Sequence, residues 1–302
     1  MKKVILTGAD GFVGRQAILP LLERQFEVHA VSNVEPPDDL VSARVRWHKT
    51  DLLAEDEVRR LTDTIGATHL LHFAWYVEHG RFWTSEHNAA WVEASLNLFE
   101  NFLTNGGVRI VASGTCVEYE LDTDDFLNEV STPLKPQTLY GQCKLELQNK
   151  LAGITGDWAW GRIFFLFGEH EHPARLVPSV INSLLDGEFA DCSHGRQIRD
   201  FLHVADVAEA FAALVDSDVQ GCVNIASGEP KTIRELVDEA ASILGRREKI
   251  RFDVVPTSEH EPKRIVADVM RLRDEVKWKP SSSLHERLEQ TIEWWKEKRA
   301  MR

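Results

Sequence analysis

Residues 2–14 read KKVILTGADGFVG, an apolar run followed by three glycines with two residues between each pair. The run predicts a buried strand, and the apolar spacing of residues 17–22 predicts a helix directly after the glycines. Such a turn can hold a diphosphate, because the free amides and the positive end of a helix attract an anion. Gly8 allows the tight turn, Gly11 lets the backbone approach the phosphates, and Gly14 lets helix and strand pack closely. The alternative is a glycine turn without a ligand.

Composition limits the classes of protein to consider. The chain has 302 residues, of which 43% are hydrophobic, enough for one large domain or two modest ones. No apolar run has membrane-spanning length and the first strand starts near the N-terminus, so we expect a cytoplasmic protein without a signal or transit peptide. Four cysteines without paired spacing indicate free thiols, and the histidines lack partnered ligands, so no metal site is expected. The net charge of -13 opposes nonspecific binding to nucleic acid or acidic membranes.

The second predicted strand, residues 27–32, ends where a dinucleotide-binding fold meets the adenosine ribose. An acidic residue there would bind both ribose hydroxyls and repel a 2′-phosphate. This chain has Ser32 and Asn33 instead, so the sequence favours NADP, with NAD possible because no arginine directly follows the strand. Arg15 is the nearest cation by sequence, and it is either a phosphate ligand or an exposed helix residue.

Two further strands lead to possible cofactor contacts. A strand at residues 45–48 precedes Asp51 and Leu52, an acid and an apolar residue that can bracket an adenine ring. The alternative for Asp51 is to cap the helix that follows it. Residues 68–74 are nearly continuous apolar, as in a parallel strand covered on both faces, and the small Ala74 at their end lets a dinucleotide pass close.

A candidate acid–base site follows the fifth predicted strand, residues 108–112. Thr115 comes at the end of this strand, and Tyr140 and Lys144 follow inside a predicted helix. Their spacing of four places Tyr140 and Lys144 on one helix face, one turn apart. An ammonium beside a phenol favours the phenolate and lowers the phenol pKa, and the positive charge of an oxidised nicotinamide would add to this effect. Thr115 can hydrogen-bond the same substrate oxygen.

In these motifs the chain resembles the extended short-chain dehydrogenase/reductases, the NAD-dependent epimerase/dehydratase family that acts on nucleotide-linked sugars. Later segments agree, because residues 162–168 match its sixth strand and residues 199–207 match a strand-to-helix signature of the extended branch. The resemblance implies an α/β fold with a Rossmann-type doubly wound parallel sheet and a smaller C-terminal substrate domain. We expect the dinucleotide-binding domain at residues 1–164, with part of 191–226 returning to it, and the sugar-nucleotide-binding domain at residues 165–302.

The resemblance also implies a role for each matching residue. The catalytic residues would be Thr115, Tyr140 and Lys144. Besides Tyr140 and Lys144, the cofactor contacts would be Gly8, Asp10, Gly11, Phe12, Val13, Gly14, Ser32, Asn33, Asp51, Leu52, Phe73 and Ala74. The substrate contacts would be Thr115, Arg175, Leu176, Val177, Arg199, Asn224 and Arg264.

The second half of the chain would bind the nucleotide sugar. Residues 172–178 resemble the segment over the nucleotide base, particularly in enzymes of dTDP-linked sugars. Arg199 and Arg264 match the arginines that hold the diphosphate, whose oxygens a guanidinium fork fits, although either arginine could instead form a surface ion pair. Asn224 would face the same ligand or satisfy backbone groups at a strand end.

Departures from the family motifs help to choose the reaction. The 4,6-dehydratases carry Asp and Glu directly after the catalytic threonine, whereas this chain has Cys116 and Val117, so dehydration is not expected. Glu118 would be a loop residue or a sugar contact. Because a reductase exchanges its cofactor in each cycle and prefers NADPH, the missing ribose carboxylate favours an NADPH-dependent 4-ketoreductase of a 4-keto-6-deoxy sugar, with Tyr140 as proton donor. The alternatives are a 4-epimerase with tightly bound NAD and, less favoured, a noncatalytic cofactor-sensing regulator.

Other features concern packing and assembly. Phe165 and Trp91 replace asparagines that are common in the family, and the first replacement affects expected sugar contacts. The resemblance implies a homodimer formed through helices at residues 85–105 and 139–151. An amphipathic helix is expected at residues 283–302, and we expect it to serve packing alone.

Overall fold

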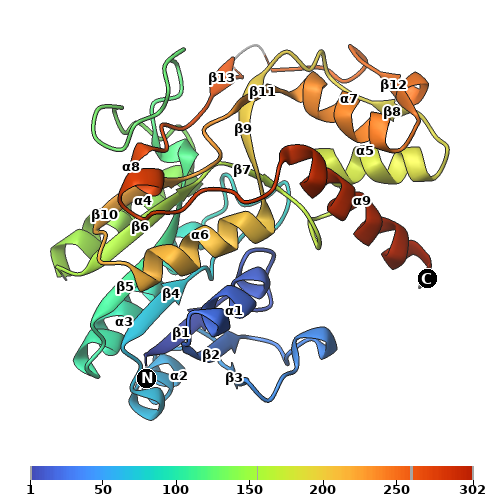
Figure 1. Cartoon of the computed structure of the whole chain (residues 1–302). Helices are drawn as coiled ribbons and strands as arrows, with labels where there is room; N and C mark the ends of the chain where they lie inside the picture. Colours follow the sequence, from blue (N-terminus) through green and yellow to red (C-terminus); the bar gives the residue numbers. More distant parts are fainter. Residues whose placement is uncertain (1, 155, 259–260, 301–302) are drawn as a thin grey trace.

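The computed structural model describes residues 2–154, 156–258 and 261–300 (Figure 1). Its largest sheet has seven parallel strands in the order β10-β6-β5-β4-β1-β2-β3. These strands are β1 (Lys3–Thr7), β2 (Glu27–Ser32), β3 (Val45–Lys49), β4 (His69–His72), β5 (Arg109–Thr115), β6 (Trp158–Ile163) and β10 (Gly221–Ile225). The order reverses between β1 and β4, and doubly wound sheets bind ligands at such a switch point. The expected fold class is confirmed.

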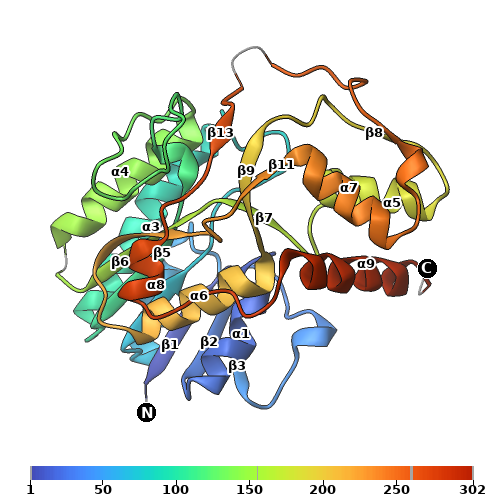
Figure 2. The same ribbon diagram turned by 45° about the horizontal axis from the view of Figure 1, so that its top comes forward.

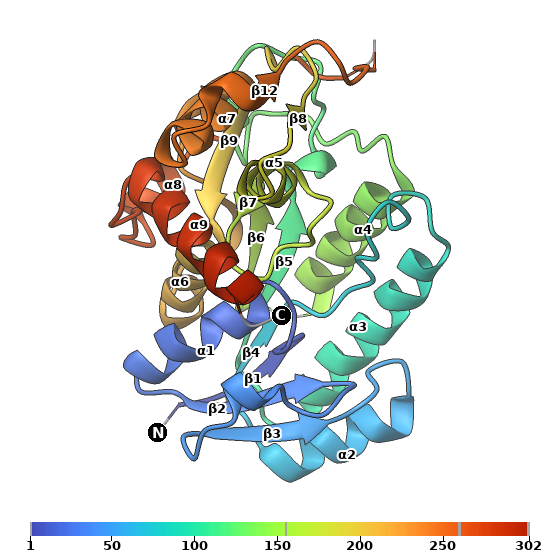
Figure 3. The same cartoon turned by 90° about the vertical axis from the view of Figure 1, so that its right-hand side faces the viewer.

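Helices cover both faces of this sheet (Figure 3). On one face lie α1 (Gly14–Glu23) and α6 (Val204–Asp216), and on the other lie α2 (Glu55–Ile65), α3 (His87–Thr104) and α4 (Leu139–Ile154). Alternate residues of a strand serve the two layers, as Val4 packs with α1 and α6 while Ile5 packs with α2, α3 and α4. Each face of the sheet therefore has its own buried core.

A smaller sheet is built around β9 (Ile198–His203), which pairs with β7 (Phe165–Phe167), β11 (Pro230–Thr232) and β13 (Arg264–Ile265). β8 (Ala190–Asp191) pairs with β12 (Ile250–Arg251). Figure 2 shows α5 (Leu176–Leu185), α7 (Ile233–Ile243) and α9 (Leu284–Ala300) side by side to one side of the large sheet. The buried face of α9 includes Leu288, Ile292 and Trp295, so the tail helix packs as expected.

The remaining elements are short: η1 (Asp38–Leu40), η2 (Cys116–Glu118), η3 (Arg247–Lys249) and α8 (Met270–Asp274). After β9, the chain returns through α6 to β10 at the edge of the large sheet. The domain boundary at residue 164 stays a prediction. In the described part of the chain, no helix combines the length and apolar character needed to cross a membrane.

Two of the strand ends that differ from the sequence-based expectation shape the site, and the segment expected as one strand at residues 162–168 is divided between β6 and β7. β5 continues to Thr115 because its last residues pair with β6, Thr115 lying opposite Ile163. β4 ends at His72. Beyond it the Phe73 amide still donates to the Thr7 carbonyl at 3.3 Å, and the amides of Phe73 and Ala74 also donate to the side-chain hydroxyl of Thr7.

Candidate active site

The glycine turn lies against the chain that leaves β4. Gly8 has a φ of +64°, and an added Cβ would be only 2.9 Å from the amide nitrogen of Ala74. Gly14 begins α1, and its Cβ would overlap the carbonyl group of Gly8. The Gly11 amide donates to the Gly8 carbonyl at 3.0 Å, which closes the turn. Only glycine leaves this cradle open, as a close approach of phosphate to the backbone requires.

A buried hydrogen-bond chain joins the ends of β1 and β4. The Thr7 hydroxyl accepts two amide hydrogens, so its own hydrogen is directed to Nδ1 of His72, 2.8 Å away. Nε2 of His72 then donates to Ser95 Oγ at 3.0 Å, and Ser95 donates to the Trp91 carbonyl. Burial, with the charge of Lys144 adding to it, lowers the pKa of His72 to about 3, so this ring is neutral. This series of hydrogen bonds ties the ends of β1 and β4, at the switch point beneath the glycine turn, to α3.

The predicted catalytic side chains are brought together at the ends of β5 and α4. Tyr140 is partly buried, and the rings of Phe82 and Trp83 meet it edge to face at 5.0 and 5.8 Å between centroids. Loss of hydration on burial raises the pKa of the Tyr140 phenol, and the negative charge of Glu118 raises it further. A hydrogen bond with Thr115 opposes the shift. The phenol therefore keeps its proton at neutral pH in the chain alone.

Lys144 lies one helical turn from Tyr140 and is almost completely buried. Its Nζ donates to the Ser113 carbonyl at 2.9 Å and lies 3.9 Å from the centre of the Trp75 ring. Burial lowers the pKa of Lys144 to about 7, and the charge of Glu118 opposes this shift. A lysine with this pKa is divided between its charged and neutral forms near neutral pH. Trp75 was not expected in the site, and its only signal in the sequence is its place directly after Ala74.

The predicted adenosine contacts lie around the ends of β2 and β3. Ser32 is buried and its Oγ accepts the Val34 amide, while Asn33 is exposed. Asp51 is exposed and accepts the Leu53 amide at 3.0 Å. The N-cap position of α2 is Ala54, so Asp51 forms a turn before the helix and does not occupy its cap.

The other predicted cofactor contacts belong to the turn or to a core. Asp10, Phe12 and Val13 are partly buried in the glycine turn. Leu52 and Ala74 are buried in the core on the α2, α3 and α4 face. Phe73 is partly buried and meets the Phe211 ring edge to face at 4.8 Å.

Arg15 is not an exposed helix residue. Its side chain is 11% exposed and donates to Asp39 at 2.7 Å and to Nδ1 of His170 at 2.6 Å. This guanidinium therefore joins α1 to the loop after β2 and to the loop after β7.

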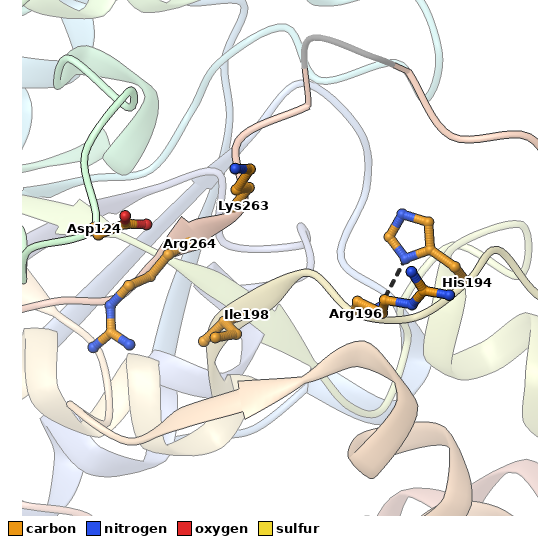
Figure 4. Close-up of a pocket in the computed structure, with 6 residues that line it drawn as sticks. All are labelled: Asp124, His194, Arg196, Ile198, Lys263 and Arg264. Atoms are coloured by element: carbon orange, nitrogen blue, oxygen red, sulfur yellow. Dashed lines mark hydrogen bonds between the residues drawn. The ribbon is translucent and has the colours of Figure 1, made fainter.

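A basic pocket of about 590 Å³ lies beside β9 and β13 (Figure 4). Its lining consists of Asp124, His194, Arg196, Ile198, Lys263 and Arg264. The Arg264 guanidinium lies over the Phe126 ring at 4.6 Å, and among the described residues its buried Nε has no hydrogen-bond partner. A cationic pocket with an unsatisfied donor suits an anionic ligand.

Arg199, the other predicted diphosphate ligand, is nearly buried next to this pocket. It donates to Glu261 at 2.8 Å and to the Ile198 carbonyl at 2.9 Å. Its guanidinium lies 5.3 Å from the centre of the Phe165 ring. Arg199 is therefore already paired, and a diphosphate would have to share it with Glu261 or displace that carboxylate.

Arg175, Leu176 and Val177 begin α5 and differ in exposure. Arg175 is exposed at the N-cap position, whereas Leu176 is partly buried and Val177 packs in the core with α7 and α9. Burial raises the pKa of nearby Glu171 to about 8, and the Arg175 guanidinium opposes this shift. The same guanidinium also acts on Tyr140. Of the three, Arg175 is thus the one whose charge acts on a candidate catalytic residue, Tyr140.

Asn224 is fully buried in β10. Its amide nitrogen donates to the carbonyls of Leu127 and Asp268, and its oxygen accepts the Tyr119 hydroxyl at 2.8 Å. Of the two roles considered from the sequence, this arrangement corresponds to satisfying backbone groups at the strand end. All of these partners are protein groups, so in this structure Asn224 holds chain segments together.

This fold and these side chains define an oxidoreductase of the short-chain dehydrogenase/reductase type. Residues 4–226 match the model of the NAD dependent epimerase/dehydratase family. The chain therefore belongs to that family, which confirms the expected resemblance and the expected class of enzyme.

Individual relatives agree with the family but differ in reaction. UDP-glucose 4-epimerase of Schizosaccharomyces pombe is 25% identical over 96% of this chain and 93% of its own. The dTDP-4-dehydro-6-deoxyglucose reductase of Escherichia coli is 23% identical over 96% of both chains. The structure of UDP-glucose 4-epimerase from Thermotoga maritima matches with a TM-score of 0.87 and 20% identity, covering 98% of this chain and 99% of its own. The structural match shows the shared fold.

The residues present fit a nicotinamide dinucleotide. The open backbone cradle at Gly8 and Gly14 would accept the diphosphate. The Lys144 ammonium uses one hydrogen on Ser113 and faces the Trp75 ring, which leaves another for a ribose hydroxyl. Tyr140 and Thr115 lie next to this lysine at the end of the central strands.

Proposed function

We propose that the protein is an NADPH-dependent 4-ketoreductase of a nucleotide-linked 4-keto-6-deoxy sugar, with deoxythymidine diphosphate as the nucleotide part. The observation that carries this proposal is the placement of Tyr140, whose phenol hydrogen-bonds Thr115, one helical turn before the buried Lys144 on α4. A reduction needs a proton donor at the carbonyl oxygen, and a phenol with a raised pKa is already in that form.

Each side chain has a separate task in this reaction. The bound dinucleotide supplies the hydride. Thr115 and Tyr140 would hydrogen-bond the carbonyl oxygen at C4, and Tyr140 would give its proton to the oxygen as negative charge develops there. Lys144 would hold the nicotinamide ribose and stabilise the phenolate that remains.

The basic pocket supports an anionic, diphosphate-bearing substrate. Arg196, Lys263 and Arg264 gather there against the single acid Asp124 of the lining, in a chain whose net charge is -13. A local cluster of cations in an acidic protein is expected where an anionic ligand must be held. The names of the relatives, which act on UDP- and dTDP-linked sugars, support the same class of substrate.

Dehydration is not proposed, because the two positions after Thr115 offer no acid or base. Burial raises the pKa of the Cys116 thiol to about 12, and Val117 is apolar. Glu118 is completely buried and bonded to Arg162 at 2.6 Å. None of the three can exchange protons with a sugar in this arrangement.

The second candidate is a 4-epimerase with tightly bound NAD. The similarity to the Schizosaccharomyces pombe UDP-glucose 4-epimerase favours an epimerase as strongly as the similarity to the Escherichia coli dTDP-4-dehydro-6-deoxyglucose reductase favours a reductase. An epimerase would begin by taking a proton from the sugar, so Tyr140 would first have to become a phenolate. A noncatalytic regulator is not pursued, because the chain keeps both Tyr140 and Lys144.

The preference for NADPH rests on Ser32 and Asn33, which place no carboxylate at the end of β2. The loop beyond them is acidic, and Asp39 holds Arg15. A 2′-phosphate could recruit Arg15 only by breaking this pair. Titrations with NADPH and NADH compare the two cofactors, and tighter binding of NADH would contradict the proposed preference.

The reaction is tested with dTDP-4-keto-6-deoxyglucose and NADPH, by following absorbance at the nicotinamide band. Stoichiometric oxidation supports the reductase, whereas C4 inversion of a nucleotide hexose without net oxidation supports the epimerase. Tyr140→Phe should reduce turnover by about 100-fold or more with little change in binding. Tyr76→Phe is the matched control, because that phenol donates to the side chain of Glu78. Equal turnover of Tyr140→Phe and wild type would reject the assignment.

The resemblance implies a homodimer through α3 and α4. Exposed positions on these helices include Glu93, Glu146 and Lys150, and Lys150 pairs with both glutamates at 3.2 Å. Light scattering at micromolar concentration measures the assembly, and a monomeric mass would contradict the dimer.

A further inference from the structure

Glu118 is a buried acid next to the catalytic threonine. It ends η2, and its carboxylate is completely buried. One oxygen accepts the Thr115 amide at 2.8 Å, and the other accepts Nε of Arg162 at 2.6 Å. The Trp160 indole donates to both oxygens, at 3.0 and 3.2 Å. Three separate donors thus fix this carboxylate, and one of them is the backbone of Thr115.

The contacts of Glu118 continue into a wider buried network. Arg162 also donates to the Tyr119 hydroxyl at 3.0 Å and to Gln148 on α4 at 3.4 Å. Tyr119 donates in turn to Asn224 of β10. The network therefore joins β6, β10 and α4 to the segment that carries Thr115.

Gly114 makes room for this arrangement. An added Cβ at Gly114 would lie 2.7 Å from Oε1 of Glu118 and still closer to Nε1 of Trp160. The backbone before Thr115 thus runs directly against the carboxylate, which couples the position of Glu118 to the position of Thr115.

Several charged or titratable groups face the Tyr140 and Lys144 pair. Those that act on Tyr140 are Glu118, Cys116 and Arg175, and Thr115 hydrogen-bonds it. Lys144 is faced by Glu118 and by the neutral His72, with the Trp75 and Trp160 rings around its Nζ. The Cys116 thiol and His72 are both neutral near pH 7, whereas Glu118, which is paired with Arg162, carries a negative charge that acts on both candidate catalytic residues.

We propose that Glu118 is a positioning residue of the proposed reaction, holding Thr115 through its backbone amide and keeping one buried negative charge near Tyr140 and Lys144. It touches neither substrate nor cofactor. The same charge opposes loss of the proton from both residues, so Glu118 favours the protonated forms of Tyr140 and Lys144. The benefit of this role for catalysis rests on the proposed function. The effect of the Glu118 charge on the pKa of Lys144 can be measured without any reaction.

The test is Glu118→Gln, which removes the charge and keeps the size of the side chain. The pKa of Lys144 should fall by about one unit, since a nearby charge shifts a pKa by about that amount or more. NMR titration of the lysine Cε signals measures it, with Lys144→Met to assign the signal. If the ketoreductase is active, the alkaline limb of its kcat/KM profile should move to lower pH, because both residues then lose their protons earlier.

The matched control is Asp206→Asn, which breaks another buried carboxylate–arginine pair. Asp206 on α6 binds Arg287 of α9 through both oxygens, outside the candidate site. This variant should lose stability without any change in the titration of Lys144. Loss of stability alone therefore does not account for the expected shift.

The double variant Glu118→Gln with Arg162→Gln guards against a folding defect, because removing both charges leaves no uncompensated buried ion. Lys144 should titrate early in this variant too. An unchanged Lys144 titration in either folded variant overturns the proposal. Failure of both variants to fold also overturns it, because the Glu118–Arg162 pair would then serve the stability of the fold alone. Absence of NADPH oxidation in wild type would reject the proposed function, yet the NMR titration would still decide the role of Glu118.

Discussion

Replacing Gly14 with alanine is expected to disrupt the glycine turn although it adds one methyl group. The new Cβ would lie 2.8 Å from the carbonyl carbon of Gly8, nearer still to its oxygen, and 3.1 Å from Cα of Ala9. All three are backbone atoms, so no side chain can rotate away. Restoring an ordinary contact with the Gly8 oxygen requires a movement of about 1.4 Å, and overpacking of this kind lowers the free energy of unfolding by about 1–3 kcal/mol.

The same movement would withdraw the turn amides from a bound diphosphate. A hydrogen bond to a charged group contributes about 1.5–3 kcal/mol, so losing one should weaken dinucleotide binding by about 10- to 100-fold. Quenching of intrinsic tryptophan fluorescence can report binding, and urea unfolding reports stability.

Gly153→Ala is the matched control for Gly14→Ala. Gly153 lies in α4, and among the described residues no atom beyond its chain neighbours and its own helical backbone lies within 4 Å of its added Cβ. Alanine there should raise the free energy of unfolding by about 0.5–1 kcal/mol and leave dinucleotide binding unchanged. If Gly14→Ala matched wild type in both stability and affinity, the reasoning about the turn would be refuted.

Three further expectations concern buried charges. Burial lowers the pKa of Lys144 to about 7, so between pH 7 and 10 the unfolded chain holds this proton and the folded chain does not. The free energy of unfolding should therefore rise with pH in this range. Urea unfolding of Lys144→Met should not show this rise. Burial lowers the pKa of His203 from 6.5 to about 3, so stability is lost as the pH falls between these values. The variant His203→Asn can still accept the Ala205 amide as an N-cap. Its thermal unfolding should therefore show a smaller loss of stability at low pH. Glu261→Gln should free Arg199 and tighten dTDP binding by about tenfold in calorimetry, and unchanged binding would argue against Arg199 as a diphosphate ligand.

Local patterns in the chain were sufficient to place the glycine turn and the candidate catalytic side chains, and the fold class followed from the family resemblance that these motifs carry. The turn from Gly8 to Gly14 depends on residues that are close in sequence, as does the one-turn spacing of Tyr140 and Lys144. Thr115 was expected at the end of a central strand and is there. Short-range periodicity and turn chemistry determine such features, because their energies come mainly from neighbouring residues.

The environment of these side chains depends on contacts between distant residues, which no local pattern contains. Arg162 is 44 positions from Glu118, and Glu261 is 62 positions from Arg199. Trp75 and Lys144 meet only because α4 packs against the segment that follows β4. Protonation and pairing are set by burial and by the charges within a few ångströms, so they follow from tertiary packing. The sequence could therefore place a glycine turn and an acid–base pair, whereas only packing surrounds that pair with Glu118, Trp75 and the neutral His72.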